Sequence, residues 1–120
     1  MKLLVGTDIE SVDRFKKLIE FKNKTIKNSF FDSEYNYAIN KVNIDQSLTG
    51  IWCAKEAVVK SFSQFKRITT REVEIICVKN CAPQVLIRTT RFKDLNFNIS
   101  ISISHTKLFA TAIAVLTILD

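Results

Sequence analysis

The sequence predicts an α+β fold, in which an N-terminal strand and several helices are followed by an antiparallel sheet. In the first half of the chain, apolar residues recur at the three- and four-residue spacing of helices. In the second half the period changes, and β-branched residues alternate with polar ones or form short apolar runs, as is typical of strands. Helices grouped before consecutive strands indicate an α+β arrangement.

The first half begins with a short apolar run at residues 3–5, which predicts a buried strand running into Gly6. After Ser11, a suitable N-cap, four apolar residues recur at helical spacing. We therefore expect a helix at 11–21, a second helix capped by Asp32 or Ser33, and a third and longest helix from about 47 to 65.

Four segments of the second half are predicted to be strands: 73–79 (VEIICVK), 84–90 (QVLIRTT), 98–104 (NISISIS) and 109–118 (FATAIAVLTI). In NISISIS the three isoleucines face one way and the three serines the other. Such a sheet leaves surface to cover, and the core of a chain this small is modest, so we expect an oligomer.

Composition limits the classes of protein that the chain can belong to. With 120 residues, 47% apolar and 25% charged, it is expected to form one globular domain over residues 1–120. The net charge of +6 favours an anionic partner. Nucleic acid is disfavoured as that partner, because the sequence lacks a strip of alternating aromatic and basic residues that would bind it. Three cysteines suggest reduced thiols in a cytoplasmic protein. The longest apolar run, at 108–119, is too short to span a membrane.

The segment VGTDIE at 5–10 is the first candidate site. Gly6 allows the backbone to approach another group closely, and Asp8 and Glu10 project to the same side if the strand continues. Two carboxylates at a strand end suit a hard cation such as Mg²⁺. The alternative is that Asp8 caps the following helix and Glu10 is only solvated.

The segment WCAKEAVVK at 52–60 places Glu56 and Lys60 four residues apart, on one face of the longest helix. Glu56 could add a carboxylate to a cation site, and Lys60 could meet a phosphate as a point charge. The alternative is a surface ion pair between these two residues, which would add only about 0.2–0.5 kcal/mol.

The segment SISHT at 102–106 contains the only histidine of the chain, His105. Ser104 and Thr106 flank the ring with hydroxyl groups, so phosphate binding or proton handling is the favoured interpretation. A structural or surface histidine is the alternative. A Ser–His nucleophile pair lacks an identifiable aspartate partner.

Together these segments resemble holo-acyl-carrier-protein synthase, the small bacterial class of 4′-phosphopantetheinyl transferases. The resemblance rests on GTDI near the N-terminus, FDSE in the middle (Phe31 to Glu34), WCAKEAVVK, and SISHT followed by FATAIAV. Their order and spacing agree with the family over essentially the whole chain. The most specific part is the (F/W)xxKE(A/S)xxK element, coupled to the N-terminal G-x-D.

The resemblance implies transfer of the phosphopantetheine arm of coenzyme A to a serine of an apo acyl carrier protein, with release of 3′,5′-ADP. It implies that Asp8 and Glu56 bind Mg²⁺, which bridges the pyrophosphate of coenzyme A. Lys60 would neutralise charge on that pyrophosphate. Glu10 is left open, either as a third metal ligand or as the group that accepts the serine proton.

The resemblance also assigns roles outside the metal site. Ser104, His105 and Thr106 match the family's SHT segment, which lies against the nucleotide end of coenzyme A, so His105 joins the expected catalytic residues. Arg14 matches a basic position that meets the acidic recognition helix of the carrier protein. Small members of the family are trimers whose active sites are shared between neighbouring subunits, which predicts a homotrimer.

Three departures from the family pattern affect the phosphate-binding region. Ile51 replaces a basic residue before the aromatic of the lysine–glutamate helix, SFSQFKRITT replaces a Gly-rich turn after it, and CAPQV lacks the usual glycine before the proline. Lys66 and Arg67 could supply charge in place of the turn. The alternative to an active transferase is therefore a non-catalytic coenzyme A or carrier-protein binding module of the same fold.

Overall fold

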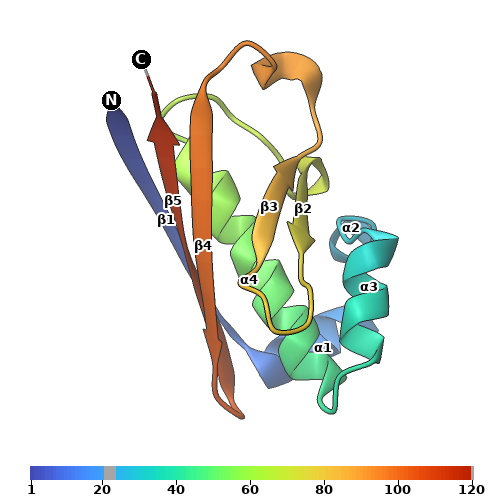
Figure 1. Ribbon diagram of the computed structural model, residues 1–120. Coiled ribbons are helices and arrows are strands. Elements are labelled where there is room, and N and C mark those ends of the chain that lie inside the picture. Colours follow the sequence, from blue (N-terminus) through green and yellow to red (C-terminus); the bar gives the residue numbers. More distant parts are fainter. Residues whose placement is uncertain (21–23, 120) are drawn as a thin grey trace.

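The computed structural model describes residues 1–20 and 24–119, apart from the side chain of residue 25. Its strands are β1 (Lys2–Ser11), β2 (Val73–Ile76), β3 (Gln84–Ile87), β4 (Phe97–His105) and β5 (Phe109–Ile118). Its helices are α1 (Val12–Glu20), α2 (Lys24–Lys27), α3 (Asp32–Ile39) and α4 (Ile44–Phe62), with 3-10 turns η1 (Thr70–Glu72) and η2 (Thr90–Phe92). This order confirms the predicted α+β fold (Figure 1).

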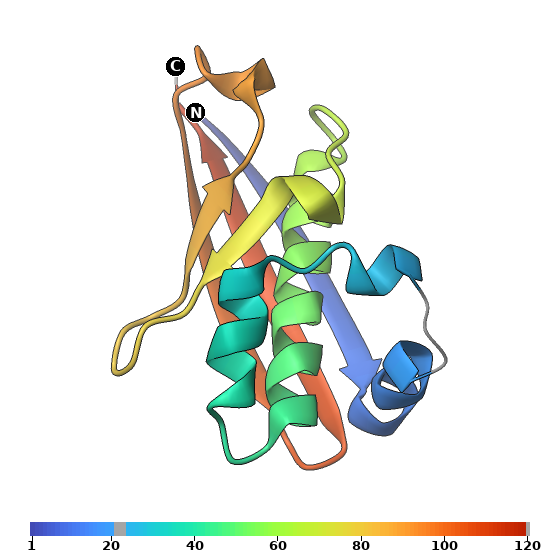
Figure 2. The ribbon, with the colours of Figure 1, turned by 90° about the vertical axis from the view of Figure 1, so that its right-hand side faces the viewer.

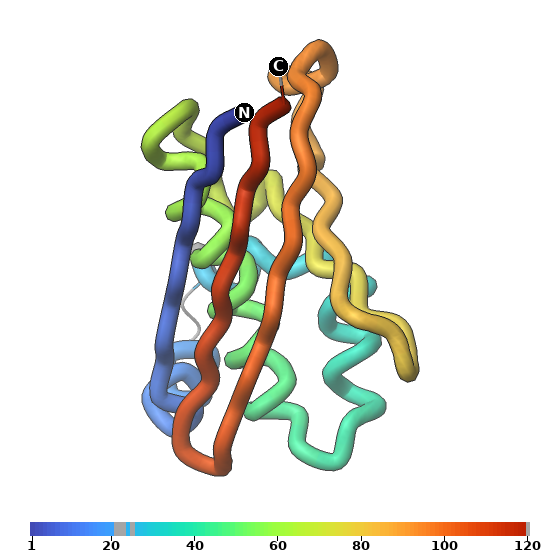
Figure 3. Tube along the Cα trace, turned by 60° about the vertical axis from the view of Figure 1, so that its left-hand side comes forward, coloured from blue at the N-terminus to red at the C-terminus, as the bar shows by residue number. Residues whose placement is uncertain are grey.

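The main sheet is antiparallel and three-stranded, in the order β1-β5-β4, and α4 packs along one of its faces (Figures 1 and 3). The register aligns Asp8 of β1 with Ala112 of β5, which in turn lies opposite Ile103 of β4. On the central strand, the residues that face α4 include the buried alanines Ala110, Ala112 and Ala114. These small side chains let the helix lie close to the sheet.

The closest approach of α4 to the sheet is at Gly6. A Cβ atom at this position would overlap the carbonyl oxygen of Ala57 and lie 2.6 Å from the backbone nitrogen of Ser61. The helix backbone thus rests directly on the backbone of β1, and only glycine leaves room for it. The prediction that Gly6 allows a close backbone contact is confirmed, and the partner is α4.

Strand β1 is longer than predicted, because it continues through Gly6 to Ser11. Its pairing with β5 is unbroken from Lys2 to Ser11. Asp8 and Glu10 therefore project to the same face of the sheet, the face that α4 covers.

The opposite face of the main sheet is covered by no helix or strand of the described residues. It exposes five large apolar side chains, Leu3, Val5, Ile9, Phe109 and Ile113. On β4 the serines at 100, 102 and 104 lie on this exposed face, while the isoleucines at 99, 101 and 103 pack against the core, as predicted. An apolar surface of this kind is characteristic of a contact between proteins.

The strands form two antiparallel sheets, because β2 and β3 make a separate two-stranded sheet beside β4 (Figure 1). Both strands are shorter than predicted. After Ile76 the chain turns back, with Asn80 at a φ of 64° and Cys81 N–H donating to the Val78 carbonyl. After Ile87 it enters η2, where Thr89 Oγ1 accepts a hydrogen bond from Arg91 N–H.

The predicted N-cap of α1 is confirmed, and the predicted N-cap of α3 is wrong. Ser11 Oγ accepts a hydrogen bond from Arg14 N–H and caps α1; the predicted final residue of this helix, residue 21, lies outside the described residues. Neither Asp32 nor Ser33 is the N-cap of α3. That position is Phe31, whose N–H donates to Glu34 Oε1 at 2.8 Å, so a carboxylate inside the first turn replaces the expected cap.

The longest helix is shifted from the predicted range of about 47–65 to Ile44–Phe62, because Asn43 Oδ1 accepts a hydrogen bond from Gln46 N–H and caps it three residues earlier. None of the described helices has the length and apolar character needed to cross a membrane.

We expect Gly6→Ala to destabilise the protein by about 1–3 kcal/mol or more, because the added methyl group overlaps the backbone of α4. Urea unfolding measures the change. Gly50→Ala is the matched control, since a Cβ there would meet one side-chain methyl group, Ile103 Cγ2 at 3.0 Å, and no backbone atom of another element. Equal losses of stability in the two variants would contradict the close backbone contact at Gly6.

Candidate functional site

Three predicted site residues meet where β1 passes beside the C-terminal half of α4. Asp8 lies on β1, and Glu56 and Lys60 lie one turn apart on α4. The Lys60 ammonium donates to Asp8 Oδ1 at 3.2 Å and to the Thr7 carbonyl oxygen at 2.9 Å. Within the described residues Lys60 pairs with Asp8 and forms no ion pair with Glu56. The surface ion pair that was the alternative interpretation is therefore wrong.

A third carboxylate, that of Glu10, lies close enough to change the pKa of Glu56. Burial raises the pKa of Glu56, the negative charge of Asp8 raises it further, Lys60 lowers it, and Glu10 raises it. Two neighbouring carboxylates thus raise the pKa of Glu56, and one ammonium group opposes them. The excess negative charge makes the site favourable for a cation.

The donor set fits Mg²⁺ bound together with a phosphate-containing ligand. Asp8 and Glu56 supply hard oxygen atoms, and Mg²⁺ is usually held by one or two carboxylates together with waters and substrate phosphates. Within the described residues, no three or more His, Cys, Asp or Glu side chains gather around one position for a metal. A site completed by phosphate oxygens does not require a third protein ligand.

Sequence reasoning did not assign Cys53 to this region. It lies fully buried on α4, one turn before Glu56, with its Sγ 3.5 Å from the Ala110 carbonyl oxygen. Burial raises the pKa of the Cys53 thiol to about 12, and the neighbouring Asp8 carboxylate adds to the shift. The thiol therefore stays protonated beneath the carboxylates. Its place one helical turn from Glu56 was the signal in the sequence that could have found it.

His105 lies in a different place, at the end of β4. Its ring lines a cavity of about 180 Å³. The walls of this cavity come from four elements: Tyr37 of α3, Gly50 of α4, Pro83 of the β2–β3 turn, and Ile103 beside His105 on β4. We refer to it below as the His105 pocket. The lining combines apolar side chains with a few polar groups, among them Gln46 and Ser47, which suits part of an organic ligand.

Ser104 and Thr106 do not join His105 in this pocket. Ser104 pairs with Thr111 of β5 on the exposed face of the sheet. Thr106 shapes the β4–β5 turn, because its Oγ1 accepts hydrogen bonds from Leu108 N–H and Phe109 N–H. All three residues border a shallow hollow beside Ile9, at the turn end of the exposed face.

The carboxylate site and the His105 pocket lie on opposite sides of α4. Figure 2 shows α3 and the β2–β3 hairpin on one side of this helix and α1 on the other. Asp8 and His105 are two strands apart in the sheet, so their Cα atoms are separated by about 10 Å or more. From Gly50 to Lys60 the helix rises by about 15 Å. One chain therefore does not bring His105 to Asp8.

Two further predicted features lie near the carboxylate site. Arg14 is exposed on α1 together with Lys17, one turn later, while Lys16 forms an ion pair with Asp45 at 3.7 Å. After Lys60, the helix ends without glycine. Ser63 Oγ donates to the Lys60 carbonyl, and Lys66 and Arg67 are exposed in the turn that follows.

Comparison with known proteins adds a family and a fold. A family model described as the 4′-phosphopantetheinyl transferase superfamily matches residues 4–114. The chain is similar to the holo-[acyl-carrier-protein] synthase of Thermodesulfovibrio yellowstonii, with 33% identity over 114 residues, which cover 94% of this chain and 96% of the relative.

Solved structures share this fold. The ACPS–CoA complex of Chronobacterium ammoniagenes matches with a TM-score of 0.87 over 100% of both chains, at 21% identity. The holo-[acyl-carrier-protein] synthase of Helicobacter pylori in complex with coenzyme A matches with a TM-score of 0.78, at 25% identity, over 95% of this chain and 100% of that one. The predicted family resemblance and fold are confirmed.

We expect Asp8→Asn to lower the pKa of Glu56 and Lys60→Met to raise it, because each substitution removes a charge that acts on this carboxyl group. Titration of the Glu56 side-chain carbon by NMR measures both changes. Asp13→Asn, which removes an exposed carboxylate on α1, is the control and should leave the pKa unchanged. No response to Asp8→Asn would contradict the proximity of these carboxylates.

Proposed function

The chain belongs to the 4′-phosphopantetheinyl transferase superfamily, and on that premise we propose how its own residues carry out the reaction. It is a holo-[acyl-carrier-protein] synthase, which transfers the phosphopantetheine arm of coenzyme A to apo acyl carrier protein. In the proposed reaction a serine hydroxyl of the carrier attacks the β-phosphoryl group, and 3′,5′-ADP leaves.

The observation that carries the proposed mechanism is the meeting of two carboxylates and one ammonium group at the edge of the sheet. Attack on the pyrophosphate builds negative charge on the bridging and leaving oxygens, so the reaction needs positive charge at fixed positions. Asp8 and Glu56 would hold Mg²⁺, which when bound supplies charge neutralisation and alignment at the pyrophosphate. Lys60 would supply the second positive charge.

Each side chain has a separate task in this scheme. The Lys60 side chain is about half exposed, so its ammonium can turn from Asp8 toward an oxygen of the pyrophosphate. Glu10 has no ion pair within the described part of the chain and acts on the pKa of Glu56. It is therefore our candidate for accepting the serine proton. Cys53 stays neutral and fills the space beneath the carboxylates.

We assign the nucleotide end of coenzyme A to the His105 pocket. Its apolar walls can contact an adenine ring, and His105 can donate a hydrogen bond to a phosphate. Ser104 and Thr106 border the neighbouring hollow and would contact the ligand from there. Ile51 lies in this pocket where the family pattern has a basic residue, so this chain has less positive charge to hold a phosphate here.

We further propose that the protein is a homotrimer in which Asp8 of one copy meets His105 of the next. Two observations support this arrangement. The two halves of the site lie on opposite sides of α4 in one chain, and the uncovered sheet face exposes Leu3, Val5, Ile9, Phe109 and Ile113. Burial of this apolar face between copies would stabilise the assembly.

The carrier protein would dock on α1. Arg14 follows the carboxylate site by six residues and is exposed next to Lys17, one turn later. Two exposed cations on one helix face, with no ion pair among the described residues, attract an acidic helix of the partner and orient it toward the site. The alternative function, a binding module without catalysis, shares these contacts but not the transfer step.

Incubation of the protein with coenzyme A, Mg²⁺ and an apo acyl carrier protein should increase the mass of the carrier by one phosphopantetheine arm. Asp8→Asn or Glu56→Gln should reduce the rate by about 10²-fold or more, because each removes one of two metal-binding carboxylates. Asp13→Asn is the control. No mass gain on any of several carriers would favour the binding module, and near-normal rates in both variants at saturating Mg²⁺ would contradict the metal assignment.

A mixing experiment tests the shared site. Asp8→Ala and His105→Ala proteins, each inactive alone, should regain about a quarter of the wild-type activity after subunits exchange at equal amounts, because one in four interfaces then pairs an intact Asp8 with an intact His105. A mixture that stays inactive after exchange, checked by mass spectrometry of the mixed trimers, would indicate that each chain completes its own site.

Arg14→Glu should raise the KM for the carrier by about tenfold or more and leave the KM for coenzyme A within about twofold, because the contact is made with the carrier alone. Lys93→Glu, which makes the same charge change at an exposed position near η2, is the control. Equal effects of Arg14→Glu on both KM values would argue against α1 as the docking helix.

A further inference from the structure

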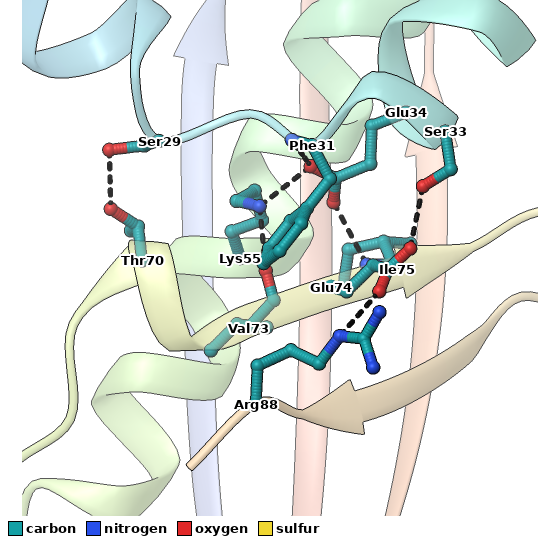
Figure 4. A network of polar contacts seen from close by, with 10 residues as sticks. All are labelled: Ser29, Phe31, Ser33, Glu34, Lys55, Thr70, Val73, Glu74, Ile75 and Arg88. Carbon is teal, nitrogen blue, oxygen red and sulfur yellow. Dashed lines mark hydrogen bonds and ion pairs between the residues drawn. The ribbon is translucent and has the colours of Figure 1, made fainter.

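A fully buried ion pair joins three elements at the centre of the molecule. Lys55 of α4 and Glu34 of α3 have no exposed side-chain surface, and Lys55 Nζ lies 2.7 Å from Glu34 Oε1. Lys55 also donates to the Val73 carbonyl oxygen of β2 at 2.6 Å, and Glu34 Oε2 accepts from Ile75 N–H at 2.8 Å (Figure 4). Lys55 and Glu34 therefore bind the backbone of β2 as well as each other.

The backbone groups that the pair satisfies are those that a neighbouring strand would otherwise bind. Arg88 N–H donates to the Glu72 carbonyl, so hydrogen-bonded positions alternate along β2 and β3, and Val73 and Ile75 point their backbone groups away from β3. No strand of the described residues pairs with this edge of β2. Lys55 and Glu34 take the place of that strand.

The β2–β3 hairpin is held by this polar contact together with the packing of Val73 and Ile75, which are buried in the apolar core. A two-stranded hairpin is at best marginally stable alone, and this one is not hydrogen-bonded into the main sheet. Glu74 of β2 reinforces the attachment to α3, because its Oε2 accepts a hydrogen bond from Ser33 Oγ at 2.6 Å. Its Oε1 lies 2.8 Å from Arg88 Nε. The Arg88 side chain is half exposed, so its contribution is expected to be small.

The position of the hairpin matters for the His105 pocket, because the β2–β3 turn forms one wall of that pocket through Pro83. The other walls come from α3, α4 and β4. Lys55 and Glu34 tie β2 to α3 and α4, so they join three of the elements that form the pocket. Neither side chain lines the pocket itself.

We propose that the Lys55–Glu34 pair is a positioning element that holds the β2–β3 turn against the His105 pocket and thereby sets the affinity for the nucleotide end of coenzyme A. This inference rests on the proposed function, since coenzyme A is the ligand. Lys55 leaves α4 toward α3 and β2, whereas Glu56 faces Asp8. The pair therefore acts on binding of coenzyme A and leaves the chemical step unchanged.

The test uses the double variant Glu34→Gln with Lys55→Met, because removal of one partner alone would leave an unpaired buried charge and could prevent folding. In the double variant neither partner carries a charge, but the Val73 carbonyl has lost its donor. Hydrogen exchange of residues 73–87 should then become about tenfold faster or more, with β1 and β5 unchanged. The KM for coenzyme A should rise by about tenfold or more, with kcat within about twofold.

Two controls separate positioning from loss of stability. Leu116→Ala removes a buried side chain of β5, so it should lower Tm without changing the KM for coenzyme A. Leu86→Ala removes an exposed side chain of β3 in the same hairpin and should change neither Tm nor the KM for coenzyme A. A double variant with a loosened hairpin and an unchanged KM for coenzyme A would overturn the inference, as would a fall in kcat alone.

The exchange measurement also separates the positioning role of the Lys55–Glu34 pair from the proposed function. Unchanged exchange of residues 73–87 in the double variant would overturn the positioning role even in an active enzyme. Failure of the unaltered protein to bind coenzyme A in a calorimetric titration would contradict the proposed function, and with it the role of the pair in coenzyme A affinity, whatever the exchange of the hairpin.

Discussion

The contact between Gly6 of β1 and the backbone of α4 is the constraint on which the rest of the structure depends. Because no side chain separates strand and helix there, α4 lies directly on the sheet, and the residues that follow on each element are brought together. Asp8 comes two residues after Gly6, and Glu56 directly precedes Ala57. The small alanines of β5 continue this close approach across the sheet. The carboxylate site is thus a consequence of backbone packing.

Larger core side chains pack around α4 at two positions along its length. Phe15, Phe30 and Trp52 form one aromatic cluster, and Phe62, Phe92 and Phe97 form another. The same helix separates the carboxylate site from the His105 pocket. On the Lys55 side of the helix, burial lowers the pKa of Lys55, and the Glu34 and Glu74 carboxylates oppose that shift.

The sequence predicted the α+β class, the alternation of isoleucine and serine in β4, and the meeting of Asp8, Glu56 and Lys60, because each follows from local periodicity or from a motif. It could not predict that β2 and β3 form a separate sheet, since their edge is satisfied by Lys55 and Glu34, which lie on helices far away in the sequence. The start of α3 was missed for the same reason. Glu34 is at once a helix cap and a partner of Lys55.

A crystal structure of the protein with Mg²⁺ and coenzyme A would test the central claim most directly, namely that Gly6 packing creates a two-carboxylate metal site completed by a second copy of the chain. The account predicts one metal ion bound by both Asp8 and Glu56, with the nucleotide in the His105 pocket of the neighbouring copy. A metal ion bound by only one of these carboxylates, or a coenzyme A molecule that reaches His105 and Asp8 of the same chain, would contradict it.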